Sequence, residues 1–377
     1  MAELNEGTVI NDRFEIVSHS GTGGFASVWK GYDRELNREV AIKRLLSKQF
    51  LDPNINNEAV DEARKIAGIS HPNIVSVFDV LKFGDEVLIV MEYLHGGSLH
   101  DLLRNLSQAR KWLRPIECFD LIQGILRGLQ AAHDAENGPI IHKDLKPLNI
   151  LFDRRKQPKI ADFGLASIGT VKPIETVHPG KWEHEGTLGY KSPEQLRGAT
   201  LDIRSDLFNV GLIAYLLLAK YHPFIDPRFL FEYKEMVLKS YRPRQKFTSE
   251  DLPGELDDFF DSLLSLNPDN RFSTAAEALS ELDHIKSIYK DFLLDQVLKM
   301  GDYLQGHQSD EVNLIDVDLA RGIMLCKQRG FYSQGAFLYE KSGVDFAELD
   351  EETKISLDND YSFCRRHVGQ EVLPDDS

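Results

Sequence analysis

The change in hydrophobic pattern between residues 93 and 98 limits the possible folds of this chain more than any other feature of its sequence. Before it, β-branched and polar residues alternate between turn signals, and after it the apolar residues follow helical spacing. We therefore predict an α+β fold of two lobes, a small sheet lobe at 14–93 and a larger helical lobe at 98–286. One helical stretch, at 57–68, interrupts five predicted strands: Phe14–Val17, Ala26–Tyr32, Glu39–Leu45, Val75–Leu81 and Glu86–Glu92.

The helical part contains the signals of several separate helices. Pro115 opens an apolar-periodic segment that runs to about Ala135, since proline is favoured in the first turn of a helix. The longest apolar run, Leu207 to Ala219, contains Asn209 and is too short to span a bilayer, so we interpret it as a buried core helix. Helices are predicted near 203–219, 228–239, 254–266 and 274–286.

Charge and cysteine content narrow the class of protein. A net charge of −16 argues against a nucleic-acid binder and is compatible with a basic protein segment as a substrate. Cys118, Cys326 and Cys364 are too few and too far apart for a disulfide framework or a zinc site. Residues 1–13 lack the basic and apolar regions of a signal peptide, and we expect them to be an N-terminal extension of a cytoplasmic protein without membrane association.

A glycine-rich segment lies between the first two predicted strands. Its residues Gly21, Thr22, Gly23 and Gly24 lack the side chains that would keep a phosphate away from the backbone N–H groups. A tight hairpin is the alternative interpretation. A dinucleotide-binding turn is excluded, because a strand and not a helix follows.

One lysine, Lys43, ends an apolar strand. An exposed lysine on a strand is the common case, and a functional one needs a carboxylate partner. The helical stretch at 57–68 offers Glu62, which we prefer, with Asp61 and Glu58 as alternatives. A Lys43–Glu62 ion pair would direct the lysine toward phosphates.

The segment from Ile141 to Leu151 carries the groups that phosphoryl transfer requires. That reaction needs an acceptor for a hydroxyl proton, a cation for the transferred phosphate and oxygen ligands for Mg²⁺. Asp144, Lys146 and Asn149 can supply these in order, and Asp162, after a short strand pair, can hold Mg²⁺ against the phosphates. This set at this spacing is very improbable by chance.

With these motifs in chain order, the sequence resembles the eukaryotic-type serine/threonine protein kinase family over about three quarters of its length. The matches are the glycine loop, Val40-Ala41-Ile42-Lys43, the Asp144-Leu-Lys-Pro-Leu-Asn149 loop and Asp162-Phe163-Gly164. The resemblance implies a protein-kinase-like fold, with ATP and Mg²⁺ as cofactors. It also implies transfer of the γ-phosphoryl group to Ser or Thr of protein substrates, autophosphorylation included.

The resemblance assigns further residues by position. Val28, Ala41 and Leu151 would enclose the adenine, Met91 would be the gatekeeper, and residues from Glu92 to Leu94 would form the hinge backbone. Asp206 would lie on the central helix of the helical lobe. A structural ion pair would join Glu194 and Arg271, Thr187 would contact the catalytic loop, and a stacked column would contain Val77, Ile66, Phe163 and His142.

Three positions depart from the family pattern. Ala26 replaces the third glycine of the loop, and Ser192 replaces Ala before Pro193-Glu194. Lys143 stands where most members have Arg. That Arg binds a phosphate of the activation segment, here residues 162–194, through two parallel hydrogen bonds. We therefore expect a weaker dependence on phosphorylation of that segment, although it contains Ser167, Thr170 and Thr176, and we expect Trp182 to anchor it.

The chain continues beyond the resemblance as an acidic extension at 287–377. From residue 301 it holds 16 acidic and 7 basic residues, and its apolar residues follow helical spacing. We expect a helical cap on the helical lobe or a contact surface for a partner protein. Two alternatives to an active kinase stay open, a pseudokinase scaffold and a small-molecule phosphotransferase.

Overall fold

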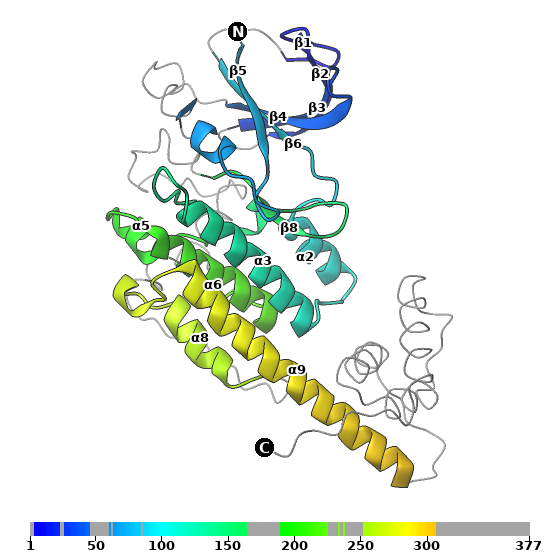
Figure 1. Cartoon of the computed structure of the whole chain (residues 1–377), viewed down its shortest axis with the longest axis vertical. Coiled ribbons are helices and arrows are strands. Elements are labelled where there is room, and N and C mark those ends of the chain that lie inside the picture. The colour runs from blue at the N-terminus through cyan, green and yellow to red at the C-terminus, as the bar shows by residue number, and fades with distance from the viewer. Residues whose placement is uncertain are drawn as a thin grey trace. The chain divides into compact units, whose positions relative to one another are not determined.

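The computed structural model describes residues 4–22, 26–45, 60–61, 63–83, 86–163, 189–224, 233, 237 and 252–306, with side chains up to residue 292. Contacts within the chain divide it into one unit from Met1 to His284 and another from Ile285 to Ser377. The first unit contains the predicted sheet lobe and the predicted helical lobe up to residue 284, and most of its strands and helices are labelled in Figure 1. The predicted extension lies outside the described residues from position 307 onward, as does most of the predicted helix at 228–239.

The sheet lobe is one antiparallel sheet of six described strands in the order β1-β2-β3-β4-β6-β5. All five predicted strands are present. Part of the predicted N-terminal extension adds a short strand, β1, which pairs with the start of β2. The strands are β1 (Val9–Ile10), β2 (Phe14–Thr22), β3 (Ala26–Asp33), β4 (Arg38–Leu45), β5 (Val77–Phe83) and β6 (Glu86–Glu92).

The alternation of side chains along β4 divides the core of this lobe into two clusters. Val40 and Ile42 are fully buried in one cluster, together with Phe14 from β2. Ala41 belongs to the other cluster, together with Met91 from β6. Since successive side chains point to opposite faces of a strand, Lys43 lies on the same face as Ala41. The strand pattern therefore places one buried lysine beside the second cluster.

The helical lobe is built around two buried helices, α3 (Pro115–His133) and α6 (Ile203–Ala219). The predicted core helix is confirmed, because nearly every residue of α6 is buried and such a helix belongs in the interior. The flanking helices are α2 (Leu99–Gln108), α5 (Pro193–Arg197), α8 (Glu255–Leu263) and α9 (Ala275–Gly306). Across the part of the chain that the structure describes, none of the helices combines the length and hydropathy needed to span a membrane.

The segment before β5 joins the two lobes. Asn73 donates from its amide to the carbonyl of Pro158 at 2.8 Å, and its own carbonyl accepts from Ile160 N–H at 2.8 Å. These contacts hold the hairpin of β7 (Ile150–Phe152) and β8 (Pro158–Ile160). Gly128 on α3 allows this approach, because a Cβ there would lie 2.7 Å from the Asn73 carbonyl oxygen. The hairpin that leads to Asp162 is thus fixed between α3 and the sheet lobe.

The connection from β6 to α2 is attached to the same hairpin. Gly96 N–H donates to the carbonyl of Phe152 at 2.9 Å, and Phe152 N–H donates to the carbonyl of Gly97 at 3.0 Å. A Cβ on Gly96 would lie 2.6 Å from the Cβ of Phe152, and Gly97 has a φ of +71°. Both positions therefore require glycine, one for close approach and one for backbone conformation.

We predict that Gly128→Ala destabilises the chain by about 1–3 kcal/mol, because the new methyl group overlaps a backbone oxygen that cannot move independently. The measurement is the free energy of unfolding from denaturant titration. Gly254→Ala is the matched control, since nothing lies within 4 Å of a Cβ there. Equal effects of the two changes would contradict the packing argument.

Candidate active site

An ion pair between a buried lysine and a partly exposed aspartate joins the two lobes. The Lys43 Nζ atom lies 2.7 Å from Asp162 Oδ1, and Lys43 is only 7% exposed. Asp162 follows β8 and has a φ of +63°, a left-handed conformation that Asp adopts more readily than most residues. The lysine comes from the sheet lobe and the carboxylate from the hairpin of the helical lobe. Two residues predicted to handle phosphates and Mg²⁺ are therefore in direct contact.

The loop after Ile141 is held by the carboxylate of Asp206 on α6. Its Oδ2 accepts the backbone N–H of His142 at 2.7 Å, and its Oδ1 accepts that of Lys143 at 2.9 Å. His133 Nε2 lies 3.0 Å from Oδ2. Lys143 has a φ of +66°, so this loop turns sharply at the residue before Asp144. The position predicted for Asp206 on the central helix is confirmed.

His142 connects the two acidic loops. Its Nε2 donates to the carbonyl of Ala161 at 2.8 Å, and its Nδ1 accepts the N–H of Asp144 at 3.2 Å. Burial lowers the pKa of His142, which agrees with a neutral ring that donates from one nitrogen and accepts at the other. The ring of His142 thus fixes the distance between the backbone of Asp144 and the backbone of Ala161, the residue before Asp162.

The carboxylate of Asp144 lies between two lysines. Lys146 Nζ is 2.7 Å from its Oδ2, and Lys191 Nζ is 2.9 Å from its Oδ1. Burial alone would raise the pKa of Asp144, but the charges of Lys191 and Lys146 outweigh burial and hold the pKa below its ordinary value. At neutral pH Asp144 is therefore ionised and able to accept a proton.

Asn149 and Asp162 supply oxygen donors of the kind that Mg²⁺ binds. Asn149 is buried, and its amide nitrogen donates to the carbonyl of Asp144 at 2.8 Å, which leaves the amide oxygen for a cation. Ala161 N–H donates to the carbonyl of Asn149 at 2.9 Å, so the segments that carry Asn149 and Asp162 are neighbours. The donor set fits a magnesium site, with one amide oxygen and one carboxylate.

The residues predicted to enclose adenine share one apolar cluster. Ala41 and Met91 are buried in it, and the partly buried residues packed against it include Val28, Leu94 and Leu151. These come from both lobes, since Leu151 lies on β7.

The hinge and the glycine loop are partly described. The side chain of Glu92 pairs with Lys159 at 3.0 Å, and its backbone N–H donates to the carbonyl of Ser76 at 2.9 Å. Gly21 and Thr22 end β2, opposite Val28 and Ser27 of β3.

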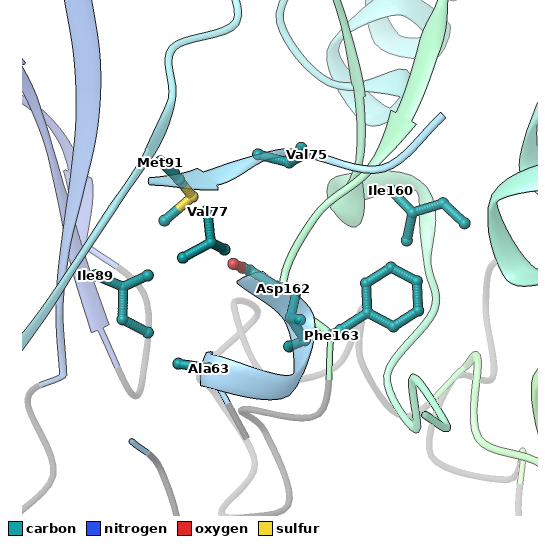
Figure 2. A pocket seen from close by; sticks show the side chains of 9 residues that line it. Ala63, Val75, Val77, Ile89, Met91, Ile160, Asp162 and Phe163 are labelled. Atoms are coloured by element: carbon teal, nitrogen blue, oxygen red, sulfur yellow. The ribbon is translucent and has the colours of Figure 1, made fainter. Parts of the chain in front are cut away.

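An apolar cavity lies beside Met91, and Asp162 contributes the charged group in its lining (Figure 2). Ile66 and Val77 line it together with Phe163, whose ring packs on His142 at 4.7 Å between centroids. Three residues of the predicted column, Val77, Ile66 and Phe163, thus surround one cavity, and the fourth, His142, packs on Phe163.

Glu194 on α5 and Lys191 just before it both form ion pairs, and only the pair of Glu194 was predicted from the sequence. The predicted pair of Glu194 and Arg271 is confirmed: Arg271 Nη1 donates to Glu194 Oε1 at 2.8 Å and Nη2 donates to Oε2 at 2.9 Å, and both residues are buried. Lys191 was not predicted as a site residue. It follows Tyr190 in a segment without apolar periodicity, and only the fold brings it to Asp144.

Several predicted residues lie outside the described residues. Among them are the preferred partner of Lys43, two glycines of the loop, and the activation-segment residues: Glu62, Gly23, Gly24, Gly164, Ser167, Thr170, Thr176, Trp182 and Thr187. Of the alternatives to Glu62, Asp61 is exposed and contacts Arg64 at 3.4 Å, and Glu58 lies outside the described residues.

Comparison with known proteins gives consistent matches. The family described as protein kinase domain matches residues 14–282. The chain is 32% identical over 282 residues to a probable serine/threonine-protein kinase of Clostridium perfringens, CPE1738, covering 74% of this chain and 39% of that protein. It is 31% identical over 288 residues to serine/threonine-protein kinase PknB of Mycobacterium leprae, covering 74% of this chain and 44% of that protein. The chain thus spans about two fifths of the length of these relatives.

The fold also matches a solved structure. The kinase domain of Mycobacterium tuberculosis PknI aligns with a TM-score of 0.57 at 21% identity, covering 75% of this chain and 99% of that one. This likeness concerns the fold, and it agrees with the predicted two-lobed architecture.

We predict that Glu194→Ala lowers the free energy of unfolding by about 3–5 kcal/mol, because it leaves the buried charge of Arg271 without its partner. Thermal and denaturant unfolding measure the loss. The exposed pair of Arg204 and Asp269 is the control: Asp269→Ala should change stability by less than about 1 kcal/mol, since that carboxylate is 77% exposed.

The pH dependence gives a second measure of the same pair. Burial alone would raise the pKa of Glu194, but the hydrogen bonds and charge of Arg271 outweigh it and lower the pKa. Stability from this group is therefore complete above the ordinary value of 4.5 and is lost as the pH falls through the folded-state pKa. A Glu194→Ala variant with unchanged stability at neutral pH would contradict the assignment.

Proposed function

The chain belongs to the protein kinase family, and we propose that it transfers the γ-phosphoryl group of ATP to serine or threonine hydroxyls of proteins, its own included. The observation that carries the proposal is the contact between Lys43 and Asp162, close to an Asp144 that is held ionised by two lysines. The names of the relatives described above agree with this class of activity.

Each group has a proposed role that follows from its chemistry. Asp144 accepts the proton of the attacking hydroxyl, since two ammonium groups keep its carboxylate ionised. Lys43 and Lys146 compensate phosphate charge. Asn149 and Asp162 hold Mg²⁺, which when bound neutralises the phosphate oxygens. The left-handed backbone at Asp162 and the hydrogen bond of Asn149 set the positions of the two ligands.

The apolar cluster is the proposed site of the adenine. Val28 and Ala41 would contact it from the sheet lobe and Leu151 from the helical lobe, with Met91 at the back and the backbone of residues 92–94 at the edge. The glycine-rich end of β2 would cover the phosphates. The proposal treats Glu62 as the partner that would direct Lys43.

Two rival functions make different predictions. A pseudokinase scaffold has no need for a catalytic lysine, an ionised aspartate or metal ligands. The presence of all four such residues disfavours it: Lys43, Asp144, Asn149 and Asp162. A small-molecule phosphotransferase would share Asp144 and Asn149, but it has no need for the peptide platform predicted at 187–194. Lys191, in the described part of that platform, contacts Asp144, and Gln195 directly after the platform contacts Lys143. Incubation with labelled ATP and a mixture of proteins separates the three, since only a protein kinase labels protein.

The backbone of Lys143 supports weak dependence on activation-segment phosphorylation. Its N–H donates to Asp206, and its carbonyl accepts from Gln195 Nε2 at 2.6 Å. Both contacts hold the catalytic loop without any phosphate. Lys143 also offers a single point charge to a phosphate, where arginine would offer a planar pair of donors.

We predict that Lys43→Met and Asp162→Asn each reduce phosphoryl transfer at least about a hundredfold, equivalent to ~2.7 kcal/mol of activation free energy. Asn keeps the left-handed backbone that position 162 requires, so folding should survive. Initial rates with labelled ATP measure the transfer, and the melting temperature controls for folding. Folded variants with wild-type rates would overturn the assignment of these two residues.

We also predict that dephosphorylation lowers the initial rate only a few fold. The wild type, treated with phosphatase, is compared with a variant in which Ser167, Thr170 and Thr176 are all replaced by Ala. Both should behave alike, because the loop is held by Asp206 and Gln195 in either state. A fall in the initial rate of about a hundredfold or more would contradict the weak dependence on phosphorylation.

A further inference from the structure

Lys191 places a second positive charge directly on the carboxylate of Asp144. Its Nζ lies 2.9 Å from Asp144 Oδ1 and 3.4 Å from the carbonyl oxygen of Lys143. Lys146 occupies the other carboxylate oxygen. Two ammonium groups therefore serve one carboxylate, which leaves a local excess of one positive charge in a chain whose net charge is −16.

The position of Lys191 is set by its backbone. The carbonyl of Tyr190 accepts a hydrogen bond from the amide of Asn209, and the carbonyl of Lys191 accepts one from the Tyr233 hydroxyl at 2.9 Å. Asn209 and Tyr233 are both fully buried. Ser192 then caps α5 immediately afterwards. The lysine is thus held beside the catalytic loop by the interior of the helical lobe.

The ammonium group retains capacity for another partner. An ammonium has three N–H donors, and Asp144 and Lys143 take two of them. The side chain is 24% exposed, so solvent or a substrate can reach it. Lys146 is different, because its proposed partner during transfer is a phosphate of ATP.

Distances restrict what that partner can be. On the proposed function, the accepting hydroxyl comes within about 3 Å of the Asp144 carboxylate. The Lys191 ammonium touches Oδ1 of the same carboxylate, so it lies within about 6 Å of an accepting oxygen that approaches Oδ1 and within about 8 Å of one that approaches Oδ2. Consecutive Cα atoms are about 3.8 Å apart, which brings the side chain of a neighbouring substrate residue within reach.

We infer that Lys191 determines substrate specificity by binding an Asp or Glu side chain directly next to the accepting Ser or Thr. This inference rests on the proposed function and adds a substrate class to it. The net negative charge of the chain favours basic segments at long range, but salt screens that effect beyond about 8 Å, whereas Lys191 acts at contact distance. A charge-assisted hydrogen bond at this point selects the residue beside the hydroxyl.

The test uses peptide mixtures with a single serine in a degenerate background. In one pair of mixtures the residue before the serine is fixed as Glu or Gln, and in a second pair the residue after it is fixed in the same way. We expect the wild-type chain to phosphorylate the Glu mixture about tenfold faster, in kcat/KM, than the Gln mixture of one pair. Lys191→Met should reduce this ratio to about one, and Lys191→Arg should retain most of it.

A matched control separates local contact from general charge. Arg197 is an exposed cation at the end of α5, the helix that begins two residues after Lys191, and Arg197→Met should leave the Glu-to-Gln ratio unchanged. If Lys191 only positioned Asp144, Lys191→Met would slow both mixtures equally and leave the ratio intact. That outcome, or a wild-type ratio near one in both pairs, overturns the inference while protein phosphorylation itself persists. Absence of transfer to any peptide or protein overturns the proposed function as well.

Discussion

The buried carboxylate of Asp206 organises the site, because its two oxygens accept the N–H groups of consecutive residues in the catalytic loop. A charge in the interior is costly unless it is hydrogen-bonded, and here the donors are backbone groups that would otherwise be unpaired in the same interior. The arrangement forces the left-handed turn at Lys143, which projects Asp144 toward the lysines. The geometry of the catalytic loop is therefore a property of α6, the most buried helix of the helical lobe.

Single side chains connect the loop that Asp206 holds to the rest of the site. His142 forms hydrogen bonds with the Asp144 N–H and with the Ala161 carbonyl. The ring of Phe163 packs on the ring of His142 and lines the apolar cavity beside Met91. Lys43 closes the path from the other lobe through Asp162. The Lys43–Asp162 ion pair and the apolar residues around the cavity thus join the lobes together with the hydrogen bonds of Asn73 and the Glu92–Lys159 pair. Polar contacts set distances between reacting groups, while the apolar column sets the position of the hairpin that bears them.

Much of this could be predicted from the sequence, for reasons that are local. The strands follow from alternation, α6 follows from its uninterrupted apolar run, and the spacing from Asp144 to Asn149 fits within one loop. Lys191 could not be predicted, because its contact with Asp144 depends on Asn209 and Tyr233, which are distant in sequence and hold its backbone. The strand β1 was missed for a similar reason, since two residues carry no periodicity and their pairing with β2 decides their conformation.

The glycine pair between the lobes has a mechanical consequence. Gly96 and Gly97 form hydrogen bonds with Phe152 on both sides, and the backbone bridge continues from Ser98 to Leu151. A rotation centred on these glycines would break that short ladder. A rotation of the sheet lobe that preserved this ladder would have to take place earlier, at residues 93–95, between the end of β6 and the anchored pair. In such a rotation Leu151 would stay with the helical lobe while Val28 and Ala41 moved with the sheet lobe, so the proposed adenine site would be divided between a fixed part and a moving part.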